Sequence, residues 1–232
     1  PDQKFDYILA NPPFNISDWG GEKYESDSRW FYGRPPVGNA NFAWLQHILW
    51  KLRPGGEAGV VLANGSLSSH TSNEGKIREE MVRKDVVEVM VSLPGNLFLN
   101  TPVPASLWFF ATDKTQRGRD RRGETLFIDA SQMGTMVTRK DRVLTDEDIS
   151  KITETVHSWR NGKDYENVPG FCYEANFEEI EKNSFVMSPG RYVGIQDEVD
   201  DGEPFDQKME RLTSLLKEQQ EQGRELDRKI NQ

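Results

Sequence analysis

Near its start the chain reads Lys4-Phe5-Asp6-Tyr7-Ile8-Leu9-Ala10-Asn11-Pro12-Pro13-Phe14. The apolar run over 4–10 predicts a buried strand, and the proline pair ends it. Further along, apolar residues at helical spacing alternate with short apolar runs that are bounded by turns. We expect helices over 41–52 and 73–84, and strands over 58–63, 86–93, 105–112 and 126–130. This alternation is typical of βαβ units, so the sequence predicts an α/β fold with a mainly parallel sheet.

Composition limits the classes of protein. The chain has 232 residues, and its 12 Phe, 6 Trp and 6 Tyr exclude a disordered polymer. One Cys and 3 His leave neither a disulfide framework nor a Cys/His metal site, so we expect no metal and a cytoplasmic location. No apolar run is long enough to span a membrane. The net charge of -9 argues mildly against a wholly basic, nucleic-acid-binding surface. The partner must therefore be inferred from a site.

The pattern changes after residue 131. Thr145 and Asp148 resemble a capping box that opens a helix, and the inward face of this helix would carry Ile149, Ile152, Val156 and Trp159. Residues 161–204 show no periodicity and are predicted to be irregular. From residue 205 the pattern indicates a polar helix with a coiled-coil-like apolar seam of Phe205, Met209, Leu212, Leu216, Leu226 and Ile230. This seam is too short to be stable alone, so we expect it to need a partner.

The turn Asn11-Pro12-Pro13-Phe14 suits chemistry on the amine of an adenine. The lone pair of that nitrogen is delocalised into the ring, and two acceptors on its two hydrogens would localise it. The Asn11 side chain offers one oxygen and the Pro12 backbone carbonyl offers the other, while the prolines fix the turn. Phe14 offers a π-face to an extruded base. The alternative is a turn that merely ends the strand. Its place at the carboxyl end of a strand favours function.

The stretch 5–14 resembles the catalytic motif of the amino-methyltransferases. Other stretches narrow the resemblance to the modification (M) subunit of type I restriction–modification systems. They are NFAWLQHIL at 41–49, LRPGG at 52–56, LPGNLF at 93–98 and LTDEDI at 144–149 running to WR at 159–160. The resemblance implies a partial Rossmann-like methyltransferase sheet, its second half, followed by a helical extension. It also implies a DNA adenine-N6 methyltransferase that flips its base and uses S-adenosylmethionine as methyl donor.

The resemblance also assigns roles to individual residues. Asn11, Pro12 and Phe14 would be catalytic, and Phe98 would pack on the flipped adenine together with Phe14. Trp44 would form a wall of the pocket for the donor's own adenine. The alternative for both Trp44 and Phe98 is an ordinary place in the core.

The sequence departs from the family in one respect. In the family, a Gly-rich donor-binding motif and an acidic residue lie upstream of the catalytic motif, and neither occurs here. We therefore expect residues 1–131 to be the C-terminal half of the catalytic domain, 132–204 a helical or irregular extension, and 205–232 a partner-binding helix. We also expect this chain alone to be inactive and to bind the donor weakly. The bare edge of the strand at 4–10 should favour self-association.

The resemblance implies double-stranded DNA, a specificity subunit and a restriction subunit as partners. The tail helix would pack on the specificity subunit, or else fold back on its own domain. A basic loop either contacts phosphates or is a solvated turn; its cations are Lys114, Arg117, Arg119, Arg121 and Arg122. The aromatic-rich loop 17–41 either closes over a flipped base or is disordered. Two other functions stay open: a stand-alone DNA or protein-glutamine amino-methyltransferase, and a non-catalytic interaction fragment.

Overall fold

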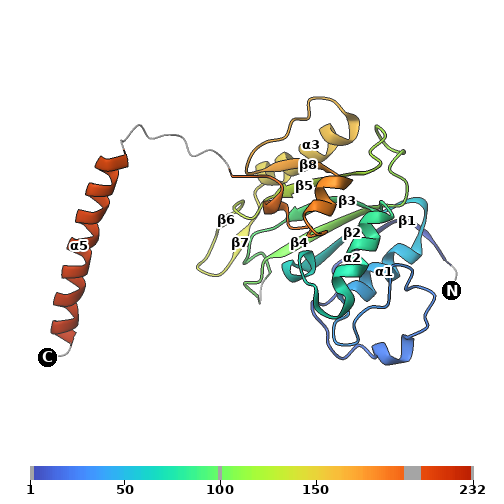
Figure 1. Ribbon diagram of the computed structural model, residues 1–232, viewed down its shortest axis with the longest axis horizontal. Coiled ribbons are helices and arrows are strands. Elements are labelled where there is room, and N and C mark those ends of the chain that lie inside the picture. The colour runs from blue at the N-terminus through green and yellow to red at the C-terminus, as the bar shows by residue number, and fades with distance from the viewer. Residues whose placement is uncertain (1–2, 99–100, 196–204, 231–232) are drawn as a thin grey trace. The chain divides into compact units, whose positions relative to one another are not determined.

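The structure is a computed structural model that describes residues 3–98, 101–195 and 205–230 (Figure 1). It divides into two compact units, Pro1–Gln196 and Asp197–Gln232. The first unit is built on a six-stranded sheet, and the described part of the second is a single helix. Within the described residues, no helix combines the length and apolar character that a membrane crossing requires.

The sheet has the strand order β1-β2-β4-β3-β5-β8. The strands are β1 Phe5–Ala10, β2 Leu52–Ala63, β3 Val87–Ser92, β4 Ala105–Ala111, β5 Glu124–Asp129 and β8 Cys172–Asn176. β1 is parallel to β2 and β3 is parallel to β5, whereas β4 is antiparallel to both β2 and β3, and β8 is antiparallel to β5. Hence β1, β2, β3 and β5 share one direction, and β4 and β8 run against it.

The prediction of a mainly parallel sheet is confirmed for strand direction, because four of the six strands run the same way, and three of the five neighbouring pairs are antiparallel because β4 and β8 run against the rest. β4 returns from β3 through a connection with no helix and inserts between β2 and β3. Its apolar sequence could not reveal this, since a strand buried on both faces shows the same apolar run in either direction.

Two helices cover one face of the sheet. They are α1, Asn41–Lys51, and α2, Glu74–Arg83, as the spacing predicts. Their buried side chains pack with β-strand aromatics in one cluster that includes Phe42, Leu45, Ile77, Met81, Trp108, Phe110 and Phe127. The opposite face carries α3, Asp146–Asn161, whose buried Trp159 packs with Val89, Val91, Leu126 and Ile128. The predicted capping box of α3 is confirmed, because the Thr145 hydroxyl accepts from Asp148 N at 3.2 Å.

β2 begins at Leu52, earlier than the predicted start at residue 58, because Pro54-Gly55-Gly56 forms no chain-reversing stop. In the pairing of β1 with β2, Phe5 lies opposite Leu52 but Tyr7 lies opposite Glu57, so the extra residues bulge out of β2. A Cβ on Gly56 would lie 2.9 Å from the Arg53 carbonyl oxygen and 3.1 Å from that of Phe5. The bulge therefore requires glycine at position 56.

The prediction of irregular structure over 161–204 is wrong for its middle part. β8 and the short helix α4, Phe177–Lys182, lie there, and Asn176 and Glu179 form a second capping box. β8 reads Cys-Tyr-Glu-Ala-Asn, which has too little apolar alternation to announce a strand, and its place depends on pairing with β5. The sheet thus continues past the boundary predicted at residue 131. The remaining elements are short: β6 Thr135–Met136, β7 Arg142–Val143, and the 3-10 turns Gly21–Tyr24, Asn64–Leu67, Thr71–Asn73 and Pro189–Arg191.

The tail forms the predicted helix, α5, Phe205–Ile230. Its seam residues Met209, Leu212, Leu216 and Leu226 are exposed, and so is Leu215. The side chains of Phe205 and Ile230 lie outside the described part of the structure. A coiled-coil seam stays a prediction.

β1 has a bare side, as predicted. Among the described strands it pairs with β2 alone. The prediction that this strand is buried is wrong, because the exposed fractions of Tyr7 and Leu9 are 64% and 86%. Self-association through this edge stays a prediction.

The predicted basic loop is held to the rest of the domain by ion pairs. Arg121 and Glu88 are both fully buried and lie 2.9 Å apart, and Arg160 of α3 binds the second oxygen of Glu88. Lys114 binds Asp85 at 2.5 Å, and Arg117 binds Glu57 at 3.3 Å. Arg119 binds Glu124 and Glu174, and Arg122 binds Asp120. Every cation of this loop has a carboxylate partner, which opposes the interpretation of the loop as a phosphate-binding surface.

Replacing Glu88 with Gln should lower the free energy of unfolding by about 3–5 kcal/mol, because it leaves the guanidinium of Arg121 buried without a counter-charge. Urea unfolding measures this. The matched control is Glu79→Gln, which breaks an exposed pair with Arg83 on α2 and should cost about 0–1 kcal/mol. Equal losses in the two variants would contradict a stabilising role for the buried network.

Candidate functional site

The carboxyl ends of β1, β2, β3 and β5 meet at one edge of the sheet, because these strands share a direction. The segments that follow them are 11–16, 64–70, 93–98 and 130–145. This is the edge at which ligands bind in open α/β sheets. Asn11, Pro12, Phe14 and Phe98 all lie in these segments, as the sequence predicts.

The turn after β1 is tied to the start of α1 by a pair of amides. Asn15 has a left-handed backbone with a φ of 54°, and its N–H donates to Asn41 Oδ1 at 3.0 Å. Asn41 Nδ2 donates back to Asn15 Oδ1 at 2.8 Å, and Asn41 is almost fully buried. Neither residue was predicted as functional from the sequence. This reciprocal pair fixes where the catalytic-motif turn leaves the strand.

The Asn11 side chain is exposed and forms no hydrogen bond with the described part of the chain. Its amide oxygen is therefore available to a ligand. Phe14 is half-buried and meets Phe98 edge to face, with ring centroids 5.8 Å apart and an interplanar angle of 89°. Phe98 comes from the β3–β4 connection, where it bridges to Thr101. The structure thus brings together two aromatic residues that the sequence analysis had paired by resemblance alone.

Trp44 lies elsewhere, in a pocket of about 240 Å³ between α1 and the loop 17–41. The pocket is lined by three loop aromatics, Trp19, Tyr24 and Trp30, and by Arg29, Ala40, Ala43, Trp44 and His47. The indole Nε1 of Trp44 is buried and has no hydrogen-bond partner in the protein. None of the catalytic-motif residues lines this pocket, so the structure does not unite Trp44 with Asn11 and Phe14.

The loop 17–41 packs on α1. Trp19 Nε1 donates to the Pro36 carbonyl at 3.1 Å, and the Gln46 side chain holds the loop by two bonds, from Tyr32 N at 3.0 Å and to Gly33 O at 2.8 Å. The aromatic residues of this loop therefore build a pocket of their own.

Arg29 links that loop to α1 electrostatically. Its guanidinium bonds Asp27, and the hydrogen bond lowers the pKa of the Asp27 carboxyl to about 2. Its Nη1 lies 3.0 Å from His47 Nδ1. Burial, together with the charge of Arg29, lowers the pKa of His47, so the neutral imidazole accepts this bond.

Asn64 lies at the same edge of the sheet and was not among the residues predicted from the sequence. It follows β2 directly, its backbone N donates to Pro104 O at 3.3 Å, and its side-chain Oδ1 is buried without a partner. In the same turn Ser66 accepts hydrogen bonds from Trp108 Nε1 on its hydroxyl at 3.1 Å and from Arg78 Nη1 on its carbonyl at 3.3 Å. The sequence could have pointed to Asn64, because it is the first polar residue after an apolar strand that runs parallel to β1.

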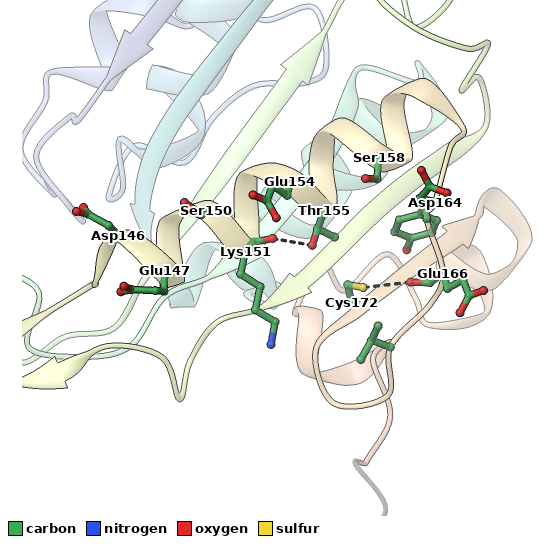
Figure 2. Close-up of a pocket in the computed structure, with 12 residues that line it drawn as sticks. Asp146, Glu147, Ser150, Lys151, Glu154, Thr155, Ser158, Asp164, Glu166 and Cys172 are labelled. Atoms are coloured by element: carbon green, nitrogen blue, oxygen red, sulfur yellow. Dashed lines mark hydrogen bonds between the residues drawn. The ribbon is translucent and has the colours of Figure 1, made fainter.

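A groove of about 800 Å³ lies between α3 and the segment 164–172 (Figure 2). Its walls carry five carboxylates, from Asp146, Glu147, Glu154, Asp164 and Glu166, against one cation, Lys151. Burial raises the pKa of the Cys172 thiol in this groove, so the sulfur is no activated nucleophile. None of the predicted site residues lines it. Within the described chain, no group of three or more His, Cys, Asp and Glu residues is placed to hold a metal ion.

This fold is that of a known class of proteins. The family model described as N-6 DNA Methylase matches residues 1–201, and the chain belongs to that family. It is 51% identical over 232 residues to the type I restriction enzyme HindI methylase subunit of Haemophilus influenzae, a match that covers 99% of this chain and 51% of the relative. It is 38% identical over 239 residues to the type I restriction enzyme MjaIX methylase subunit of Methanocaldococcus jannaschii, covering 100% of this chain and 42% of the relative.

A solved structure supports the same assignment. The type I restriction-modification system methyltransferase subunit from Streptococcus thermophilus matches with a TM-score of 0.70 and 28% identity, covering 83% of this chain and 39% of that one. The predicted family and the α/β methyltransferase fold are confirmed. The chain spans about half the length of the curated relatives it matches.

Replacing Asn64 with Ala should leave the free energy of unfolding unchanged or raise it, because the change removes a buried acceptor that has no partner. Urea unfolding of the two proteins measures the difference. Ser66→Ala is the control: it removes the bonds from Trp108 and to Ala63 O, and should cost about 1–3 kcal/mol. A comparable loss in Asn64→Ala would show that the Asn64 amide is paired within the protein.

Proposed function

We propose that this chain is part of the modification subunit of a type I restriction–modification system, which methylates the exocyclic amine of adenine in duplex DNA. The observation that carries the proposal is the Phe14–Phe98 pair beside the unengaged amide of Asn11, at the carboxyl end of β1. The 51% identity to the HindI methylase subunit supports it.

In the proposed reaction the protein acts by positioning and by hydrogen bonding. Asn11 Oδ1 and the Pro12 carbonyl oxygen each accept a hydrogen bond from one of the two N–H groups of the amine. The two bonds draw the nitrogen lone pair out of the ring and aim it at the methyl group. Because the Asn15–Asn41 amides hold the turn, both acceptors are oriented before the base arrives. S-adenosylmethionine, the proposed donor, would supply the electrophilic methyl when bound. The nitrogen–carbon bond would form as the donor's carbon–sulfur bond breaks, the thioether would leave, and the amine would lose one proton to solvent.

The substrate base must leave the duplex to reach these acceptors, and the two phenylalanines give it a surface on which to stack. A flat ring beside Phe14 would also contact Phe98, since the two rings already touch edge to face.

We assign the donor's adenine to the pocket of Trp44. This pocket is walled by aromatic rings, and an adenine presents a π-face that can stack on them. Trp44 and its loop neighbours would hold the adenine end of the donor, while other contacts would lie outside this pocket.

The proposed partners follow from the same assignment. The specificity subunit would bind the exposed apolar side chains of α5, and the restriction subunit would complete the complex. An amphipathic helix with such a face is a common element of subunit contacts.

Asn11→Ala should lower the rate of adenine methylation roughly 100-fold or more, because it removes a transition-state contact of about 3 kcal/mol. Duplex binding should change little, because the amide acts on the flipped base alone. The assay is methyl transfer to duplex DNA by a chain of the relatives' full length, mixed with its specificity partner. Asn161→Ala, at the exposed end of α3, is the control. Near-normal turnover in Asn11→Ala would sink the mechanism.

Phe98→Ala should weaken capture of the flipped base by about 1–3 kcal/mol, the usual worth of stacking on an aromatic ring. A duplex with 2-aminopurine at the target position reports this through its fluorescence, which rises when the base leaves the stack. Phe31→Ala removes an aromatic ring from the loop 17–41 that is 70% exposed, and should leave the signal unchanged. A loss of signal in both variants, or in neither, would speak against base stacking on Phe98.

A further inference from the structure

An enzyme that flips a base must also hold the DNA backbone, and contacts to phosphates usually come from free cations. The loop 113–123 does not supply them, because each of its cations has a carboxylate partner. Cations that bind the DNA backbone must therefore lie outside this loop and have no carboxylate partner.

Two such cations lie in the segment that follows β5. In this segment β6 and β7 pair as a two-stranded ribbon, with Thr135 opposite Val143 and Met136 opposite Arg142. Its tip carries Arg139 and Lys140, both exposed. Neither side chain takes part in an ion pair or hydrogen bond within the described residues.

The ribbon is fixed beside the site. Arg142 N donates to the carbonyl of Asn96 at 2.8 Å, and Asn96 lies two residues before Phe98 in the β3–β4 connection. Arg142 Nη1 donates to Met133 O at 2.8 Å, and Gly134 N donates to the Asp148 carboxylate at 3.1 Å. The ribbon is therefore bound both to the connection that carries Phe98 and to the start of α3.

The one carboxylate at the tip, that of Asp141, accepts a hydrogen bond from a hydroxyl. The Thr138 hydroxyl donates to Asp141 Oδ2 at 2.6 Å and accepts from the N–H of Asp141 at 3.0 Å and of Lys140 at 3.1 Å. Val137 N donates to Asp141 O at 2.9 Å and closes the turn. Asp141 thus shapes the turn and forms no ion pair with Arg139 or Lys140.

We propose that Arg139 and Lys140, at the tip of the β6–β7 ribbon, contact backbone phosphates of duplex DNA next to the extruded base. The proposal rests on the proposed function, and it adds the surface that grips the substrate. A guanidinium and an ammonium without counter-charges are the groups that bind phosphate oxygens. The overall charge of -9 does not oppose this, since counterion release depends on the cations at the contact.

The test is the salt dependence of duplex binding. The double variant Arg139→Gln/Lys140→Gln is made in a chain of the relatives' full length, bound to its specificity subunit, and its affinity for a duplex that carries the target site is measured across a salt series. The slope of log K against log salt is negative, and each lost phosphate contact makes it less steep by about 0.9. The double variant should therefore make it less steep by roughly 1.8. The matched control is Arg122→Gln/Lys163→Gln, which removes the same charge from exposed positions outside the ribbon and should keep the slope.

Two results would overturn the proposal. One is an unchanged slope in the ribbon variant, or an equal fall in the control. The other is a loss of affinity for the specificity subunit with DNA binding otherwise intact, which would make the ribbon a protein contact. Failure of the proposed function is seen separately, because the unsubstituted complex would then transfer no methyl group to adenine.

Discussion

The shared direction of β1, β2, β3 and β5 is the constraint on which the rest of this molecule depends. Parallel strands leave their carboxyl ends at one edge, and the turns that follow must meet there. The antiparallel β4 between β2 and β3 preserves this arrangement, because it returns the chain from the Phe98 connection to the sheet without adding a turn that competes for the same edge. Asn11, Asn64 and Phe98 come from distant parts of the sequence and share this edge for that reason.

Strand direction alone places these segments only coarsely, and hydrogen bonds to neighbouring elements set their geometry. The Asn15–Asn41 amides join the catalytic-motif turn to α1, and the Asn96–Arg142 bond joins the Phe98 connection to the ribbon. In both cases the anchor comes from a different element than the functional side chain. A substitution at such an anchor would therefore act on the site through geometry, without contact with the substrate.

The features that the sequence predicted are local ones. The Asn-Pro-Pro-Phe turn, the spacing of α1 and α2, and the capping box of α3 each lie within a few consecutive residues. The features that it missed depend on partners far along the chain. β8 is a strand because β5 pairs with it, and Arg121 is structural because Glu88 receives it inside the protein. A run of basic letters shows that cations are present, but only the fold shows which of them are already neutralised.

That distinction explains how a chain with a charge of -9 is compatible with a proposed DNA substrate. The carboxylates of the groove beside α3 lie on walls that contain none of the predicted site residues, and those at 57, 85, 88 and 124 bind cations of the 113–123 loop or α3. What an approaching phosphate meets is decided by the ions left unpaired near the Phe14–Phe98 edge. There the tip of the ribbon presents two cations without carboxylate partners against the single carboxylate of Asp141, which accepts a hydrogen bond from the Thr138 hydroxyl. The net charge of the whole chain therefore says little about the sign of the charge where the substrate would lie.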